Sequence, residues 1–394
     1  MRYAFAECEL DLGAHVLSRA GAAVHVEPQV FDLIACLLRA DGGLVSYDDL
    51  IAQVWGGRIV SDATMAARIS AARAAVGDDG KRQAVIRTVP RRGVQMAVPV
   101  VAANGAGPVA RPAADLVQEV RIATSADGSG IAWSSIGAGP PLLRAGHWMT
   151  HLERDLDSLI WRPWIEALGR GRRLIRYDPR GTGVSDRTCG PRSLDSSVDD
   201  MAAVADAAGL DRFDLFCTSQ AAAPACVYAA RHPDRVRRMV IYGGFAQGSL
   251  VRDADGEVMT AAMAAMIRKG WGQPEGGYMR SFSALFMPAA SREQMLDFVR
   301  MQVASATPEV AVEIRECCAR YDIVDVLPQI RAPVLVAHAA RDNLHPYSQA
   351  QLFARHIPDA RIRQLDSENH SLLPDEPAFA ELMQAVDGFL GGSD

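Results

Sequence analysis

Five short apolar runs in the second half of the chain constrain its fold more than any other feature. Each run ends directly at glycine or polar residues, and patterns typical of helices separate one run from the next. The runs are 141–145, 173–177, 213–217, 239–242 and 333–337. Such alternation predicts βα units in a mainly parallel sheet. Because ligands bind at the carboxyl ends of the strands in these sheets, we expect a site just after the runs.

Length and composition narrow the class of protein further. A chain of 394 residues favours two or three domains, and its net charge of −6 gives no overall attraction to nucleic acid. The seven cysteines have no metal-like spacing, so we expect no metal, and their odd number favours reduced thiols in a reducing, cytoplasmic compartment. No cofactor is expected. There is no signal-peptide pattern and no run of about 18 apolar residues, so we expect no membrane partner.

The chain separates into three segments by composition. Residues 1–99 hold short strands, three helical patterns and a final hairpin, whereas residues 100–116 are small and contain glycine and proline. The second segment lacks the apolar residues of a core and predicts a linker. Residues 117–394 contain the apolar runs and predict an α/β domain.

Charge is distributed unevenly within the first hundred residues. Acidic residues outnumber basic ones up to Gly57, and the balance reverses from Arg58 to Arg92. A domain with one basic end is typical of a DNA-binding module, although a solvated basic face is the alternative interpretation.

Two helices are predicted inside this first domain. Ser46 and Asp49 form an acidic variant of the capping box at the start of one. The other starts at Ser61 or Asp62 and runs to Val76, with Arg68 and Arg73 flanking its apolar stripe. That stripe consists of Met65, Ile69, Ala72 and Val76, and the outward face consists of Ala63, Ala67, Ser70 and Ala74. Small outward residues offer few donors to base edges, so we expect phosphate contacts and DNA shape to dominate binding.

The ordered motifs of residues 5–98 resemble the OmpR/PhoB-type winged helix, an α+β winged helix-turn-helix fold. They are EPQVFDL at 27–33, VSYDDL at 45–50, VWG at 54–56, AARAAVG at 71–77 and IRTVPRRG at 86–93. The resemblance implies that the helix 61–76 enters the major groove of double-stranded DNA and that the hairpin touches the minor groove. Val94 departs from the aromatic residue usual after the wing glycine. The alternative is a winged helix used for protein contact.

This resemblance also implies individual DNA contacts and an assembly. Arg68 and Arg73 are expected to contact the groove or the backbone of the DNA. Thr88, Arg91 and Arg92 are expected to belong to the wing. Winged helices read paired half-sites, so a homodimer is expected.

Three residues of the second domain have the types and the order of a hydrolytic triad. Ser219 lies between an apolar run and a helical pattern, Asp342 follows the run 333–337, and His370 follows another strand-like stretch. A serine nucleophile, a histidine base and an orienting carboxylate are what acyl transfer requires. Cys217 and Ala221 replace the two glycines usual around the serine. A lone histidine is more often structural, but here the order Ser, Asp, His predicts that all three converge.

Further segments resemble the α/β-hydrolase fold. They are YDPRGTGVS at 177–185, RHPDRV at 231–236 and PVLV at 333–336. The segments WMTHLE at 148–153, GWGQ at 270–273 and YDIVDVL at 321–327 look like hydrolase-like domains fused to regulatory modules. This resemblance implies a small-molecule pocket under a helical cap at about 246–330. We expect the oxyanion donors to be the backbone N–H of Gln220 and one near His147 or Trp148. Cys217 is interpreted as a buried filler, with a redox-sensitive thiol as the alternative.

Three functions are compatible with these features. One is a DNA-binding transcriptional regulator whose hydrolase domain binds, and in some cases hydrolyses, a small-molecule ligand such as an ester or lactone. The second is an active serine esterase, lactonase or thioesterase with an accessory DNA-binding domain. The third is a protein-interaction scaffold that has lost both activities.

Overall fold

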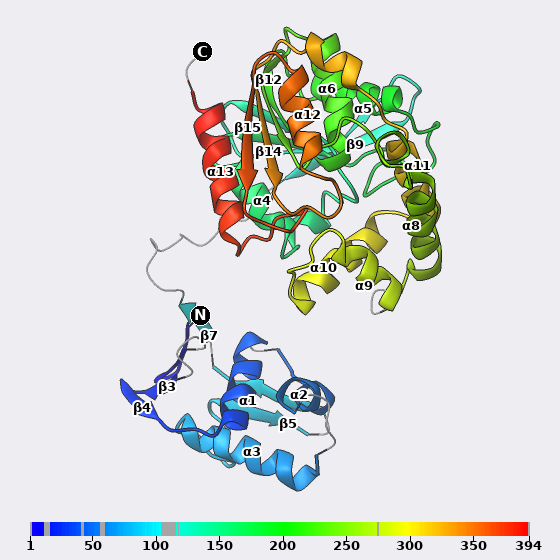
Figure 1. The fold of residues 1–394 in the computed structure, drawn as a ribbon. Coiled ribbons are helices and arrows are strands. Elements are labelled where there is room, and N and C mark those ends of the chain that lie inside the picture. Colours follow the sequence, from blue (N-terminus) through cyan, green and yellow to red (C-terminus); the bar gives the residue numbers. More distant parts are fainter. Residues whose placement is uncertain are drawn as a thin grey trace. The chain divides into compact units, whose positions relative to one another are not determined.

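The computed structural model describes residues 2–11, 16–40, 43–55, 60–90, 92–98, 100–103, 116, 118–273 and 276–392. The chain divides into two compact units, Met1–Ala113 and Ala114–Asp394, both drawn in Figure 1. This agrees with an N-terminal winged helix followed by a mainly parallel α/β domain. No helix in the described ranges is both long enough and apolar enough to cross a membrane.

The first unit places three helices beside antiparallel strands. A five-stranded sheet has the order β4-β3-β2-β1-β7, and β5 (Ile86–Val89) pairs with β6 (Gly93–Met96) as the predicted hairpin. The other strands are β1 (Arg2–Phe5), β2 (Cys8–Asp11), β3 (Val16–Arg19), β4 (Ala22–Val24) and β7 (Val100–Ala103). The helices are α1 (Pro28–Arg39), α2 (Tyr47–Val54) and α3 (Asp62–Ala75).

Strand β7 corrects the expected start of the linker. Val100–Ala103 was expected to lack regular structure, but it pairs antiparallel with β1, so that Phe5 lies opposite Val100. Val100 also packs against the core of the first unit. These four residues therefore belong to the first unit, and the remainder of the expected linker up to residue 115 lies outside the described residues.

Local sequence explains where α2 and α3 begin and which face each buries. Ser46 Oγ accepts the N–H of Asp49 at 3.1 Å, and Ser61 Oγ accepts the N–H of Thr64 at 3.2 Å. Both serines therefore satisfy a backbone donor that the helix leaves unpaired. The predicted apolar stripe of α3 is buried in the core of the unit, and the predicted outward face is exposed.

The second unit is built on an eight-stranded sheet of order β15-β14-β13-β12-β10-β11-β9-β8. The six strands from β15 to β11 pair in parallel, and β9 and β8 add antiparallel strands at one edge. All five predicted apolar runs form strands. The bounds are β8 (Glu119–Thr124), β9 (Gly130–Ile136), β10 (Pro141–Arg144), β11 (Arg173–Tyr177), β12 (Phe213–Thr218), β13 (Val236–Tyr242), β14 (Val334–Ala339) and β15 (Ala360–Leu365).

Helices between the strands cover the sheet, and a further group forms a cap. The first set is α4 (Trp161–Leu168), α5 (Leu194–Ala207), α6 (Ala222–Arg231), α12 (Ser348–His356) and α13 (Pro377–Leu390). The chain between β13 and β14 folds as α7 (Ser249–Arg252), α8 (Gly256–Gly270), α9 (Gly277–Ala284), α10 (Arg292–Ser305) and α11 (Pro308–Ala319) (Figure 1). This helical segment lies within the expected cap at about 246–330.

One buried carboxylate holds the hairpin of the first unit in place. Asp78 accepts the backbone N–H groups of Ala84, Val85 and Ile86 at 2.8–3.0 Å. Burial raises the pKa of Asp78, but these backbone hydrogen bonds outweigh it and lower the pKa to about 2. The carboxylate therefore stabilises the fold above its unfolded pKa of about 3.9, and this contribution is lost as pH falls through about 2.

We predict that Asp78→Ala loosens the hairpin, because three buried N–H groups lose their acceptor. The free energy of local opening should fall by about 1–3 kcal/mol. Amide hydrogen exchange of residues 84–86 in the full chain measures this effect. Asp32→Ala, which removes an exposed carboxylate on α1, is the control. Equal exchange rates in the two variants would contradict the assigned role of Asp78.

Candidate functional site

Ser219 occupies a strained turn between β12 and the helix that follows. Its φ is +56°, in the left-handed region that non-glycine residues rarely adopt. A short 3-10 turn, Ser219–Ala221, leads directly into α6. Such strain in a non-glycine residue persists only where the surroundings enforce it, which is common at functional sites. The turn has the strand–turn–helix form of a nucleophile elbow.

Small residues stand where the usual elbow motif has glycine. Cys217 and Ala221 are both buried, and the Cys217 thiol donates to the carbonyl of Val240 on β13 at 3.4 Å. Burial raises the pKa of Cys217 well above its ordinary value. This thiol is therefore a packed neighbour of the elbow with little thiolate character.

Asp342 and His370 form a buried hydrogen-bonded pair. His370 Nδ1 lies 2.7 Å from Asp342 Oδ2, and neither side chain has more than 1% exposure. The second carboxylate oxygen accepts the backbone N–H groups of Leu344 at 2.8 Å and His345 at 3.0 Å. Burial raises the pKa of Asp342, but the charge and hydrogen bond of His370 outweigh this and lower it. The carboxylate thus accepts from Nδ1–H and leaves Nε2 as the basic nitrogen of His370.

Strand register places His370 beside the elbow. Thr218 lies opposite Tyr242 on the adjacent strand β13, so the next residues, Ser219 and Gly243, follow neighbouring strand ends. A Cβ atom built on Gly243 would lie 3.2 Å from His370 Cε1, so the imidazole lies against this glycine. Adjacent strands are about 4.8 Å apart. The imidazole therefore lies at the strand end next to the one that carries Ser219.

The contact between Ser219 and His370 is the part of the predicted triad that this structure does not form. Among the described residues, no hydrogen bond joins Ser219 to His370, and His370 Nε2 is buried without a partner. Catalytic hydrogen bonds are often long in unliganded enzymes and shorten when substrate binds. The structure brings Asp342 and His370 together and leaves the third link as a prediction.

The side chains of the expected oxyanion residues are already engaged. Arg144 donates to His147 Nε2 at 2.7 Å, so His147 Nδ1 carries the proton and donates to the carbonyl of Trp148 at 3.1 Å. Trp148 Nε1 donates to Gln302 Oε1 of α10 at 2.9 Å. His147 and Trp148 therefore have only backbone N–H groups to offer a substrate. The backbone N–H of Gln220 lies at the start of the 3-10 turn, where the turn itself provides no hydrogen-bond acceptor.

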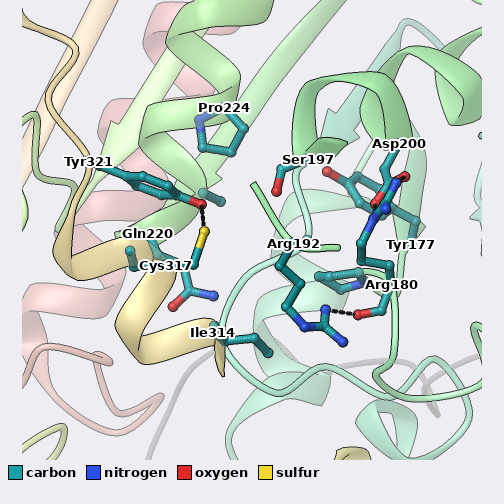
Figure 2. Close-up of a pocket in the computed structure, with 14 residues that line it drawn as sticks. Tyr177, Arg180, Arg192, Ser197, Asp200, Gln220, Pro224, Ile314, Cys317 and Tyr321 are labelled. Carbon is teal, nitrogen blue, oxygen red and sulfur yellow. Dashed lines mark hydrogen bonds and ion pairs between the residues drawn. The ribbon is translucent and has the colours of Figure 1, made fainter. Parts of the chain in front are cut away.

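Gln220 also lines a small cavity, drawn in Figure 2, of about 50 Å³. The same cavity is lined by Tyr177 at the end of β11, by Arg192 and by Cys317 of α11, but by none of the three triad residues. Ligand pockets usually have at least about 300 Å³, so this space is too small for a substrate. It adjoins the elbow through Gln220 and Ala221 but contains none of the triad side chains.

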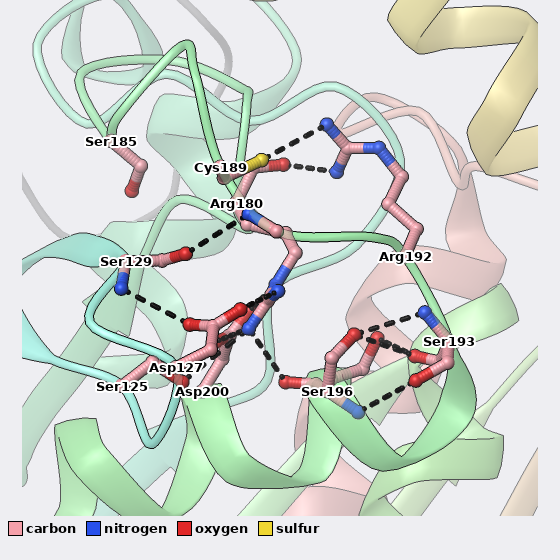
Figure 3. Close-up of polar contacts among 12 residues, drawn as sticks. Ser125, Asp127, Ser129, Arg180, Ser185, Cys189, Arg192, Ser193, Ser196 and Asp200 are labelled. Carbon is pink, nitrogen blue, oxygen red and sulfur yellow. Dashed lines mark hydrogen bonds and ion pairs between the residues drawn. The ribbon is translucent and has the colours of Figure 1, made fainter.

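Arg180, in the segment that resembles α/β-hydrolases, has a structural role. Figure 3 shows its guanidinium among carboxylates and hydroxyls from three parts of the unit. It donates to both oxygens of Asp200 on α5 at 2.6 and 2.8 Å and to Asp127 in the β8–β9 turn at 2.7 Å. With its side chain only 3% exposed, Arg180 joins α5 and the β8–β9 turn to the loop after β11.

Two histidines near Asp342 were not identified from the sequence. His338 Nε2 lies 2.9 Å from the carbonyl of His345 and 3.5 Å from Asp342 Oδ2. The ring of His345 lies edge-on to that of His370, with centroids 5.0 Å apart. The signal available in the sequence was their closeness to Asp342: His338 lies four residues before it, and His345 lies three residues after it.

The expected DNA-contacting residues of the first unit occupy different environments. Arg73 is buried and donates to the carbonyl of Ile86 at 2.9 Å and to Thr88 Oγ1 at 2.7 Å. Arg68 donates to Gln29 at 3.1 Å and pairs with Glu27. Arg73 and Thr88 therefore join α3 to the hairpin, and Arg68 joins α3 to α1. Helical periodicity did not indicate these hydrogen bonds. They join parts of the first unit to one another, whereas the prediction had the same side chains contacting DNA.

The exposed cations of the hairpin are better placed for phosphate contact. Arg92 is exposed, as its predicted wing role requires, and Arg87 on β5 is exposed as well. Arg87 was not among the predicted DNA contacts, although its alternation with buried Ile86 was a visible signal. Arg91 lies outside the described residues.

Comparisons with known proteins support the fold assigned to each unit. The profile of the alpha/beta hydrolase fold family matches residues 154–377, and that of "Transcriptional regulatory protein, C terminal" matches residues 21–96. "Putative carbamate hydrolase RutD" of Azorhizobium caulinodans is 32% identical over 268 residues, covering 66% of this chain and 94% of the relative. "Transcriptional activator CadC" of Escherichia coli is 35% identical over 86 residues, covering 22% of this chain and 17% of that protein.

Solved structures show the same fold. The enol-lactonase from Burkholderia xenovorans aligns with a TM-score of 0.56 at 21% identity, covering 69% of this chain and all of that one. An esterase from Exiguobacterium antarcticum aligns with a TM-score of 0.59 at 19% identity, covering 69% and 99%. The chain belongs to the α/β-hydrolase fold family and carries, before that domain, an OmpR/PhoB-type winged-helix domain of transcriptional regulators.

Proposed function

We propose that this protein is a DNA-binding regulator whose hydrolase domain binds a small ester, lactone or carbamate and cleaves it at Ser219. The observation that carries the proposal is the buried Asp342–His370 pair, whose imidazole lies against Gly243, at the strand end next to the strained Ser219 turn. The name of the Azorhizobium relative adds carbamates to the acyl compounds considered. Double-stranded DNA as the partner favours a cytoplasmic location for this function, and paired half-sites favour a homodimer.

The site supports an acyl-enzyme mechanism. Ser219 Oγ attacks the carbonyl carbon while its proton passes to His370 Nε2, and Asp342 stabilises the resulting imidazolium. The tetrahedral oxyanion accepts hydrogen bonds from the N–H of Gln220 and from that of His147 or Trp148. His370 then gives its proton to the leaving alcohol or amine as the carbonyl re-forms. Water, deprotonated by the same nitrogen, releases the acid and restores Ser219.

The cap contacts both loops of the proposed site, which supports a sensing role. The ring of Phe286, which follows α9, packs edge-on against that of His370 with centroids 5.9 Å apart. The backbone carbonyl of Phe286 accepts the N–H of Ser371 at 3.1 Å. Gln302 of α10 holds Trp148 in the oxyanion loop. An acyl group that enters beside His370 must therefore reorder cap contacts. Ligand occupancy would change the cap, and slow turnover would clear the ligand.

Enzymatic activity in its own right is the second candidate function, and the complete set of triad residues favours it. The two candidates differ in what Ser219 occupancy does to DNA binding. A regulator should couple the two events by about 1–3 kcal/mol, a 5- to 150-fold change in affinity. An enzyme with an accessory DNA-binding domain should show no coupling.

We predict that Ser219→Ala lowers the hydrolysis of p-nitrophenyl esters by about a thousandfold or more, because the nucleophile is lost. Ser348→Ala, at an exposed position at the start of α12, is the matched control and should keep the parental rate. Release of p-nitrophenolate measures both. Equal rates in Ser219→Ala and the parent would exclude Ser219 as the nucleophile.

We predict that the exposed hairpin arginines set the salt dependence of DNA binding. Arg87→Ala and Arg92→Ala should each reduce the slope of log affinity against log salt by about 1, since each removes one phosphate contact. Lys269→Ala, which removes an exposed cation of the second unit, should leave the slope unchanged. Fluorescence anisotropy with a duplex from upstream of the coding sequence measures the slopes. Unchanged slopes in both hairpin variants would place the DNA elsewhere.

We predict that covalent labelling of Ser219 by a fluorophosphonate changes the affinity of the full chain for the same duplex at least fivefold. The Ser219→Ala protein treated identically is the control and should not respond. Labelling without any change in affinity would contradict the sensing role and favour the enzyme alternative.

A further inference from the structure

His345 has a defined tautomer because of its neighbour in the cap. Arg252 Nη1 of α7 lies 3.3 Å from His345 Nδ1. A guanidinium only donates hydrogen bonds, so Nδ1 accepts and the ring proton is on Nε2. Burial lowers the pKa of His345 well below its ordinary value, so the ring stays neutral with one N–H donor.

Both backbone polar groups of His345 are also engaged. Its backbone N–H donates to Asp342 Oδ1 at 3.0 Å, and its carbonyl accepts from His338 Nε2 at 2.9 Å. Its Nε2–H has no hydrogen-bond partner in the described part of the chain, and although the residue is only 4% exposed, this nitrogen is not among the buried polar atoms that lack a partner. The donor at the tip of an otherwise buried residue therefore keeps access to solvent. An oriented donor at such an opening is available to a molecule from outside the chain.

The position of the ring identifies where that molecule would lie. His345 lies edge-on to His370 at 5.0 Å and packs on Phe245 at 4.3 Å between centroids. Phe245 follows Gly243 and Gly244, the turn against which His370 lies. The unpartnered donor is therefore held on the same side of the sheet as the base of the proposed triad.

We propose that His345 is a substrate-contacting residue, whose Nε2–H donates to an oxygen on the acyl side of the substrate beside His370. The inference rests on the proposed hydrolase function and narrows its substrates to acyl compounds with an additional acceptor oxygen, as in alkoxyacyl or hydroxyacyl esters and their lactones. Arg252 is the positioning residue. It also donates to the carbonyls of Gln247 at 3.1 Å and Leu344 at 3.4 Å, so α7 orients the ring from the cap.

Two nearly isosteric esters test this inference in the full chain. p-Nitrophenyl methoxyacetate carries an ether oxygen where p-nitrophenyl butyrate carries a methylene group. The readout is the ratio of kcat/KM for the methoxyacetate to that for the butyrate, divided by the same ratio for hydroxide. This readout reports selectivity, which general damage to the fold would not change in one direction.

His345→Leu should lower this ratio by roughly three- to tenfold, the effect expected for one neutral hydrogen bond. His345→Gln keeps an N–H near the position of Nε2 and should retain most of the parental ratio. Arg252→Met frees the ring and should lower the ratio in the same direction as His345→Leu. His356→Gln, a histidine on α12 remote from Asp342 in sequence, is the control and should keep the parental ratio.

Parental selectivity in both His345→Leu and Arg252→Met would overturn the inference while leaving the hydrolase proposal intact. If His345→Leu does not fold, the comparison of Arg252→Met with His345→Gln decides the matter in the same way. A parent that cleaves neither ester would contradict the proposed hydrolase function, and this inference with it.

Discussion

The hydrogen bond between Asp342 and His370 is the interaction on which the candidate site depends. It fixes the imidazole with Nδ1 protonated and leaves Nε2 free to act as a base. The carboxylate is itself held by backbone N–H groups of the loop after β14, so the parallel sheet sets its position. Gly243 completes the arrangement, because a Cβ atom there would press on the ring at 3.2 Å and its φ of +57° favours glycine.

Buried arginines connect the elements that position each site. Arg180 joins α5 and the β8–β9 turn to the loop after β11, and Arg73 joins α3 to the hairpin. Arg144 holds the imidazole of His147 in the proposed oxyanion loop. Each guanidinium provides several donors in a fixed planar geometry, which suits it to join segments distant in sequence. The cations left for ligands and DNA are therefore fewer than the arginine content of the sequence implies.

Much of the fold could be predicted from local signals. Apolar runs that end at glycine or polar residues indicated the strands, Ser46 indicated the start of α2, and periodicity indicated the buried face of α3. Strand β7 could not be predicted in this way. Its pairing depends on the free edge of β1, about one hundred residues earlier, and its small residues resemble a linker.

The candidate site was predictable in its residues but less so in its contacts. Chain order and strand ends indicated Asp342 and His370 correctly as partners. The burial of Arg73 was not predictable, because its acceptor, the carbonyl of Ile86, belongs to the hairpin rather than to α3. The role of His345 depends on a contact with Arg252, 93 residues earlier in the chain. Only the tertiary fold brings these groups together.

A crystal structure of the full chain with a boronic acid would show whether Ser219 and His370 act together, since boron bonds covalently to an activated serine. We expect tetrahedral boron on Ser219 Oγ, with His370 Nε2 within hydrogen-bond reach, about 2.6–3.2 Å, of an oxygen of that adduct. An unmodified Ser219, or an imidazole that stays out of reach of the adduct, would contradict it.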